Sequence, residues 1–183
     1  MSDPVSIRAR SLLLAATLST LVLSGCFTAR TNAPGENAPK EAWDQQISAQ
    51  YDSQQKIYTV TGGNVRKSGS SLFLRSIRTA GRSDLQVYIE AHYTDDWRMY
   101  DRAVDAEGHE LPATTIARKM GVCIGYECTH VEHIGVTVTP EYLQTHVKGG
   151  IDLELSGKGR KQRFHVPGPY IRSFLAALET KGK

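Results

Sequence analysis

The sequence predicts a mainly β fold: an antiparallel β-sandwich, Ig-like or similar, of about eight strands with two short helices, one of them C-terminal. Three features support this prediction. Segments rich in β-branched and aromatic residues recur, with turn residues about every 8 to 12 positions. In one segment Leu85, Val87 and Ile89 alternate with polar neighbours, which is typical of a strand that buries one face. Apolar residues at helical spacing are clearest near the C-terminus.

The expected strands can be placed in order along the chain. Turn-forming residues bound them, such as Gly62-Gly63 after the first strand. Ahead of them, Trp43, Ile47 and Tyr51 recur every four residues and could line one face of a short helix. We expect single strands over residues 57–61, 71–77, 85–93, 97–104, 111–120 and 129–138.

A final hairpin over residues 151–166 shows apolar alternation on both strands. For the two apolar faces to coincide, Leu153 must lie opposite Phe164. The same register places Glu154 opposite Arg163 on the outer face, where a charge pair contributes roughly a few tenths of a kcal/mol. It also leaves a loop over residues 157–160.

Two short helices complete the expected fold. The first begins after Thr139, an N-cap residue followed by Pro140, and ends before Gly149-Gly150. The second opens at Pro169, and its apolar residues recur with helical spacing. We expect this last helix to pack as a lid on one side or end of the sheets.

The N-terminus has the pattern of an export signal. Arg8 and Arg10 precede an apolar run over residues 12–23, which is too short to cross a bilayer as a helix, since that takes about 20 residues. The run ends in Leu23-Ser24-Gly25-Cys26. This segment resembles the signals of bacterial lipoproteins, which end in a Leu-small-small-Cys box. The resemblance implies cleavage before Cys26, diacylglycerol on its thiol, and a fatty acid such as palmitate on the new N-terminus. The alternative is an ordinary signal peptide with a chance cysteine.

The resemblance also implies an address and a domain organisation. In this class an Asp after the lipidated cysteine favours retention at the inner membrane, whereas this chain has Phe27. We therefore expect the periplasmic face of the outer membrane. The chain then divides into a signal peptide over residues 1–25, a lipidated cysteine with a flexible tether over residues 26–45, and a β-sandwich domain over residues 46–183.

The other two cysteines predict a disulfide. Because the lipid would take Cys26 and the periplasm is oxidising, we expect Cys123 and Cys128 to pair across a tight turn that contains Gly125. The alternative is zinc held by these cysteines with His130 and His133. Those histidines are an odd number of positions apart and should point to opposite faces of a strand, so we expect no metal and no other cofactor.

Two groups of side chains are candidates for an interaction surface. The aromatic group is Tyr93, Trp97, Tyr100 and Tyr126. The basic group, at the end of the last hairpin, is Lys158, Arg160, Lys161 and Arg163. Aromatic residues also fill cores, and basic residues also protect sheet edges, so each group has a structural alternative. The net charge of the chain is only +3, which does not indicate a nucleic-acid partner.

No local catalytic motif is present in the sequence. It lacks a Gly-x-Ser-x-Gly elbow, and the adjacent Asp95 and Asp96 fit a turn better than an acid pair. We therefore expect a lipid-anchored periplasmic binding or assembly module of the Gram-negative envelope that acts on another envelope protein, and not an enzyme. The alternative is an envelope enzyme that acts on cell-wall or lipid substrates. A deep polar cleft with a His/carboxylate pair would favour the enzyme, and an exposed aromatic or apolar patch would favour the binding module.

The lipid anchor can be tested on protein recovered from membranes. Its intact mass should match a chain that begins at Cys26 and carries fatty acids, because several acyl chains on one residue hold a protein to a bilayer almost permanently. The Cys26→Ser variant should leave the membrane fraction. Recovery of the native chain without fatty acid, and free of membranes, would contradict the anchor.

Overall fold

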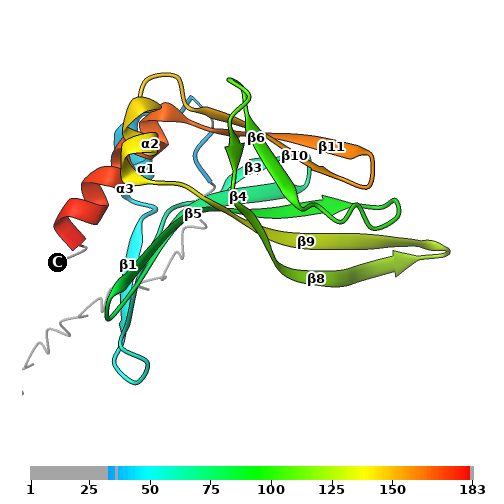
Figure 1. Ribbon diagram of the computed structural model, residues 1–183, viewed down its shortest axis with the longest axis horizontal. Helices are drawn as coiled ribbons and strands as arrows, with labels where there is room; N and C mark the ends of the chain where they lie inside the picture. Colours follow the sequence, from blue (N-terminus) through cyan, green and yellow to red (C-terminus); the bar gives the residue numbers. More distant parts are fainter. Residues whose placement is uncertain (1–32, 36, 182–183) are drawn as a thin grey trace, which may run out of the picture. The chain divides into compact units, whose positions relative to one another are not determined.

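The computed structural model of the protein describes residues 33–35 and 37–181. This part of the chain forms two antiparallel β-sheets and three helices, one of them C-terminal (Figure 1). The predicted mainly β, antiparallel class is therefore confirmed. Cys26 and the preceding signal lie outside the described residues, so lipidation stays a prediction.

The larger sheet has seven strands in the order β1-β2-β4-β5-β9-β8, and β3 pairs with β4. Every pairing in it is antiparallel. Its strands are β1 Ser48–Asp52, β2 Ile57–Thr61, β3 Val65–Lys67, β4 Ser70–Thr79, β5 Arg82–Tyr93, β8 Ala113–Ile124 and β9 Glu127–Thr137.

The smaller sheet has four strands in the order β11-β10-β6-β7. Its strands are β6 Arg102–Asp105, β7 Glu110–Leu111, β10 Ile151–Gly157 and β11 Arg160–Val166. Across the described residues the two sheets hold more strands than expected, because the short β1, β3 and β7 are additional.

The core lies between the inner faces of the two sheets. Val87 and Ile89 of β5 are fully buried, as are Leu155 of β10 and Val166 of β11. On β5 the residues that alternate with Val87 and Ile89 are only half-buried, which confirms the predicted alternation.

The last hairpin has the predicted register. Leu153 pairs with Phe164 and Glu154 with Arg163. Pairing continues to the end of both strands, so the loop is shorter than expected and consists of Lys158 and Gly159 alone. Both residues have positive φ, 39° and 72°, as a two-residue turn of this twist requires.

Helix α1, Lys40–Asp44, corrects the predicted boundary at residue 46. Its Trp43 is fully buried, and the indole ring lies 4.7 Å from the ring of Tyr170, between centroids. The folded domain therefore begins at α1, inside the stretch expected to be tether. The helix ends at Asp44, so the predicted helical face does not reach Tyr51, which is exposed on β1. The sequence around α1 does not indicate that Trp43 packs against Tyr170, because Tyr170 lies far along the chain.

The other two helices are α2, Pro140–Thr145, and α3, Gly168–Lys181. As predicted, the Thr139 side chain caps α2, accepting a hydrogen bond of 3.1 Å from the Tyr142 backbone N–H. Helix α3 packs against α1 and α2 at one end of the sheets (Figure 1). No helix in the described part of the chain is long and apolar enough to span a bilayer.

The expected strand over residues 97–104 is wrong in its first half. Residues 97–101 form a loop in which Met99 has a φ of 50°, and strand pairing begins only at β6. Tertiary hydrogen bonds to this loop, described below, replace the ladder that its β-forming residues favour.

The Tyr170 hydroxyl joins α3 to the larger sheet. It accepts a hydrogen bond of 2.8 Å from the Leu74 backbone N–H. The approach is so close that a Cβ at position 62 would lie 2.0 Å from the hydroxyl oxygen, which explains the glycine there.

Replacing Tyr170 by Phe should lower the free energy of unfolding by about 1 to 3 kcal/mol, because the buried N–H of Leu74 loses its acceptor. Urea denaturation followed by circular dichroism measures the change. Tyr51→Phe is the matched control, since Tyr51 is 59% exposed, and it should leave stability within about 0.5 kcal/mol of the native protein. Equal stability of both variants would contradict this role for the hydroxyl.

Candidate interaction surface

The β8–β9 hairpin, here called the arm, extends beyond the strand next to it. β5 pairs with β9 only as far as Tyr93 opposite His130. Beyond that point, residues 121–129 pair only within the hairpin, and we call them the arm tip. Figure 1 shows the arm tip projecting at the end of the sheets away from the helices.

Exposed apolar side chains concentrate on this arm. In the described part of the chain six large hydrophobic residues are exposed, and all except Tyr51 lie within residues 116–126. They are Ile116, Met120, Val122, Ile124 and Tyr126, the last three being 72%, 81% and 108% exposed. A contiguous exposed apolar patch of this kind is the usual character of an interaction surface, so the arm is the candidate site.

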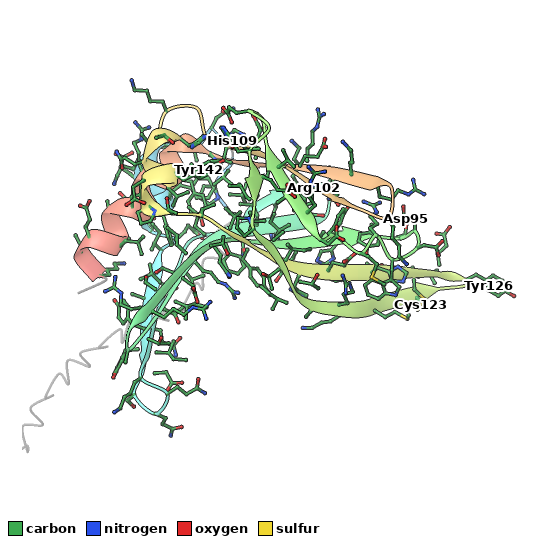
Figure 2. The ribbon with its side chains drawn as sticks, viewed as in Figure 1. Asp95, Arg102, His109, Cys123, Tyr126 and Tyr142 are labelled. Carbon is green, nitrogen blue, oxygen red and sulfur yellow. A yellow bond between two sulfur atoms is a disulfide. The ribbon has the colours of Figure 1, made fainter. Side chains whose placement is uncertain are left out.

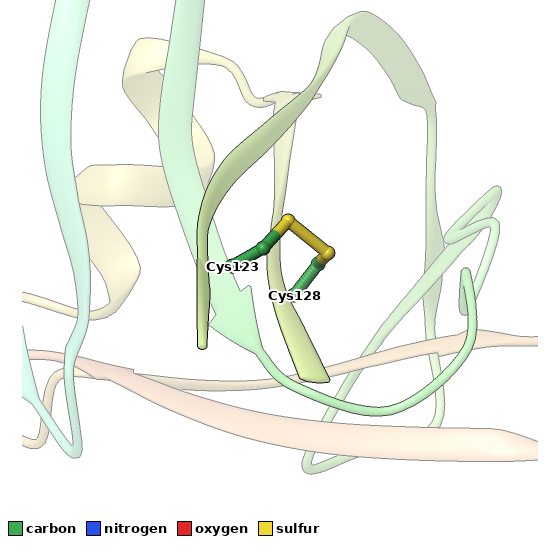
Figure 3. Close-up of a disulfide and its surroundings, with 2 residues drawn as sticks. All are labelled: Cys123 and Cys128. Carbon is green, nitrogen blue, oxygen red and sulfur yellow. A yellow bond between two sulfur atoms is a disulfide. The ribbon is translucent and has the colours of Figure 1, made fainter. Parts of the chain in front are cut away.

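A disulfide closes the arm tip. Cys123 and Cys128 are directly opposite on the two strands, with their Cα atoms 3.9 Å apart (Figure 3). The predicted pairing is confirmed, and Gly125 in the turn has the expected positive φ, 62°. Within the described residues these two strands pair with no other strand at this point, so the bond presents the exposed side chains on a constrained frame.

At its root the arm is held by the carboxylate of Glu132 on β9, which is fully buried. This carboxylate accepts hydrogen bonds from the backbone N–H groups of Met99, at 2.8 Å, and Tyr100, at 3.1 Å. It also accepts from the Tyr93 hydroxyl and, at 3.0 Å, from Nε of Arg118 on β8. One side chain thus connects both strands of the arm with β5 and the 97–101 loop.

Arg98 packs the same loop against β5. Its guanidinium lies 4.3 Å above the Tyr93 ring centroid, and its Nε donates to Asp95 over 2.9 Å. Burial, followed by the hydrogen bond to the Glu132 carboxylate, raises the pKa of Tyr93 above its ordinary value. Tyr93 is therefore a neutral donor at physiological pH.

Of the four aromatic residues predicted for a surface, the structure places two in the core. Tyr93 and Tyr100 are 7% and 0% exposed. The Tyr93 hydroxyl donates to Glu132, and the Tyr100 hydroxyl donates to Gln162 over 3.0 Å. Trp97 is partly buried against His130, with ring centroids 4.4 Å apart. Only Tyr126 is fully exposed, at the end of the arm (Figure 2).

The predicted basic residues lie on the β10–β11 hairpin, largely exposed, and three of them contact carboxylates. Lys161 and Arg163 pair with Glu154 at 2.7 and 3.2 Å. Arg160 approaches Asp95 at 3.7 Å. Lys158 occupies the turn itself. These surface pairs contribute little to stability.

The histidines near the disulfide lie on opposite faces of β9, as their spacing predicted. His130 stacks on Tyr93 on the inner side, with ring centroids 5.8 Å apart. Nδ1 of His133 lies 2.9 Å from the Tyr88 hydroxyl on the outer side. Burial lowers the pKa of His133. Because the cysteines are bonded to each other, the four residues do not form a zinc site.

The structure also contains a His/carboxylate pair that the sequence analysis did not single out. Nδ1 of His109 lies 3.0 Å from the Asp105 carboxylate in the turn between β6 and β7. Burial acts to raise the pKa of Asp105, but hydrogen bonds from the His109 N–H and the Tyr142 hydroxyl outweigh it, and that pKa is lowered. The His109 side chain is 72% exposed, so the pair opens directly to solvent.

Of the exposed arm residues, only Tyr126 was predicted from the sequence to lie on an interaction surface. A signal for the others is present, because Met120, Val122, Ile124 and Tyr126 alternate through the disulfide turn. The expected strand ended at residue 120, and the residues after it were interpreted only as the tight turn closed by the disulfide. Comparison with protein-family models, curated proteins and solved structures gives no match to this chain.

The Glu132 network gives a direct stability prediction. Glu132→Gln should lower the free energy of unfolding by about 1 to 3 kcal/mol, because the amide directs hydrogens at buried N–H and O–H donors and leaves them without an acceptor. Glu127→Gln is the control, since Glu127 is exposed on the same strand, and it should have little effect. Chemical denaturation of both variants measures the difference, and a change below about 1 kcal/mol in Glu132→Gln would contradict the role assigned to this carboxylate.

Proposed function

We propose that the protein is a lipid-anchored binding or assembly module of the Gram-negative envelope, held at the periplasmic face of the outer membrane through Cys26. The arm tip docks on another envelope protein. The observation that supports this most is the set of exposed apolar side chains on the disulfide-closed arm. An exposed apolar patch favours a binding module over an enzyme, and the arm carries such a patch.

The composition of the arm tip suits a protein partner. Tyr126 presents a whole aromatic ring with a polar end, and tyrosine is enriched among residues that dominate binding energy. Val122 and Ile124 supply aliphatic area beside it. Because the disulfide restricts the turn before binding, less conformational entropy is lost on docking.

The charges near the arm tip define the partner further. Lys119 is exposed on β8 next to Met120, Glu127 is exposed within the arm tip, and Lys158 is exposed at the end of the β10–β11 hairpin. The complementary surface is an apolar patch bordered by charges of both signs. The β8 edge is interrupted by register shifts on either side of residues 117–120, so side chains rather than an added strand would make the contact.

The anchor would raise the chance of this encounter. Helix α1, near the start of the described residues, lies at the helix end of the sheets, and the arm tip lies at the other end (Figure 1). Confinement to one membrane surface raises the effective concentration toward partners in that layer.

Photo-cross-linking in the native envelope tests the proposal. A photoreactive residue at position 124 should give a discrete protein adduct, whereas the same residue at position 51 should not, since Tyr51 is exposed at the opposite edge of the sheet. Adducts with lipid alone, or equal protein adducts from both positions, would contradict a docking arm.

Once the partner is captured, Tyr126→Ala should weaken binding about 30-fold, the loss expected for an interface residue that contributes about 2 kcal/mol. Tyr51→Ala should bind as the native protein does. Because both tyrosines are exposed, neither substitution should alter the thermal unfolding midpoint. Unchanged affinity of Tyr126→Ala in surface plasmon resonance would place the contact elsewhere.

A further inference from the structure

The turn between β6 and β7 brings three metal-ligating side chains together. Asp105, Glu107 and His109 alternate along the turn, and one ligand atom from each lies within 4.8 Å of the others. Gly108, with a φ of 89°, allows the chain to reverse between them. This group is remote from the arm, and an inference about it is independent of the proposed docking role.

The Asp105 carboxylate is already held in position. It is almost fully buried, and it accepts hydrogen bonds from the Tyr142 hydroxyl at 2.9 Å and the His109 backbone N–H at 2.8 Å. Figure 2 shows His109 and Tyr142 close to each other at the helix end of the molecule. Donors of this kind, which orient a ligand from behind, typically accompany metal sites.

A second histidine from another element lines the same surface pocket. This residue, His146, is the C-cap of α2. It lines the pocket together with Glu107, His109 and Tyr142. Nδ1 of His146 lies 2.7 Å from the Tyr142 carbonyl oxygen. A carbonyl can only accept, so Nδ1 carries the hydrogen and Nε2 keeps its lone pair. Histidines that bind a metal through one ring nitrogen commonly donate the other ring N–H to a backbone carbonyl, and His146 makes such a contact.

From these contacts we propose that the β6–β7 turn binds a divalent zinc-class cation. Asp105, Glu107 and His109 are its ligands, and the cation would take the place of the hydrogen that Nδ1 of His109 and the Asp105 carboxylate share over 3.0 Å. His146 lines the surface pocket beside Glu107 and His109. One imidazole with two carboxylates suits zinc, whereas calcium and magnesium prefer oxygen ligands throughout. Bound metal would connect the edge of the smaller sheet with the end of α2.

Calorimetric titration of the full chain, purified in detergent without a polyhistidine tag and treated with chelator, tests the site. Zinc should bind with a stoichiometry of one, and calcium should not compete. His109→Ala and Asp105→Asn should each lower zinc affinity by at least about 10-fold, and Tyr142→Phe, which only orients a ligand, by about 10-fold or somewhat more.

His92→Ala is the matched control, since it removes a histidine from β5 in the other sheet. It should bind zinc as the native protein does. Circular dichroism verifies that each variant is folded, and zinc should raise the unfolding midpoint of the native chain but not of His109→Ala. Absence of zinc binding in the native chain, or equal binding by folded His109→Ala, would overturn the proposal.

Discussion

Glu132 places a carboxylate where solvent does not reach it, and the surrounding chain is arranged to neutralise that charge. Burying an unpaired carboxylate costs several kcal/mol, so donors must converge on it. They come from β5, from β8 and from the backbone of the 97–101 loop. Meeting this requirement holds the backbone of the loop, turns the Tyr93 side chain inward, and fixes the root of the arm against the sheet.

Among the described strands none pairs with the arm tip, because β8 and β9 extend beyond the end of β5. β5 ends opposite His130, and beyond it the hairpin has only its own pairing and the Cys123–Cys128 bond. A two-stranded ribbon is marginal in water, and here a covalent link supports it. Exposed apolar side chains on such a ribbon bury little surface in the fold, which is the physical reason for the proposed docking role.

Sequence reasoning succeeded where a pattern is local. Alternation located β5, and the need for two apolar faces to coincide determined the register of Leu153 with Phe164. The disulfide followed from cysteine count and compartment, although the compartment itself stays a prediction. The reasoning failed for α1, since five helical residues carry a weak signal and Trp43 is buried only by contact with Tyr170, far along the chain. It failed for the same reason at the β6–β7 turn, where Asp105 acquires its setting from Tyr142 on α2.

The sequence by itself determined the antiparallel β class, the positions of most main strands along the chain, the register of the last hairpin and the pairing of Cys123 with Cys128, because each follows from a period of two or from residues close together. Only the tertiary structure decided which aromatic residues are buried, where the folded domain begins and which strands extend beyond the ends of their neighbours. Burial depends on contacts between segments that are distant in the sequence. The local sequence around a tyrosine therefore does not show whether its ring lies in the core or at the tip of an arm.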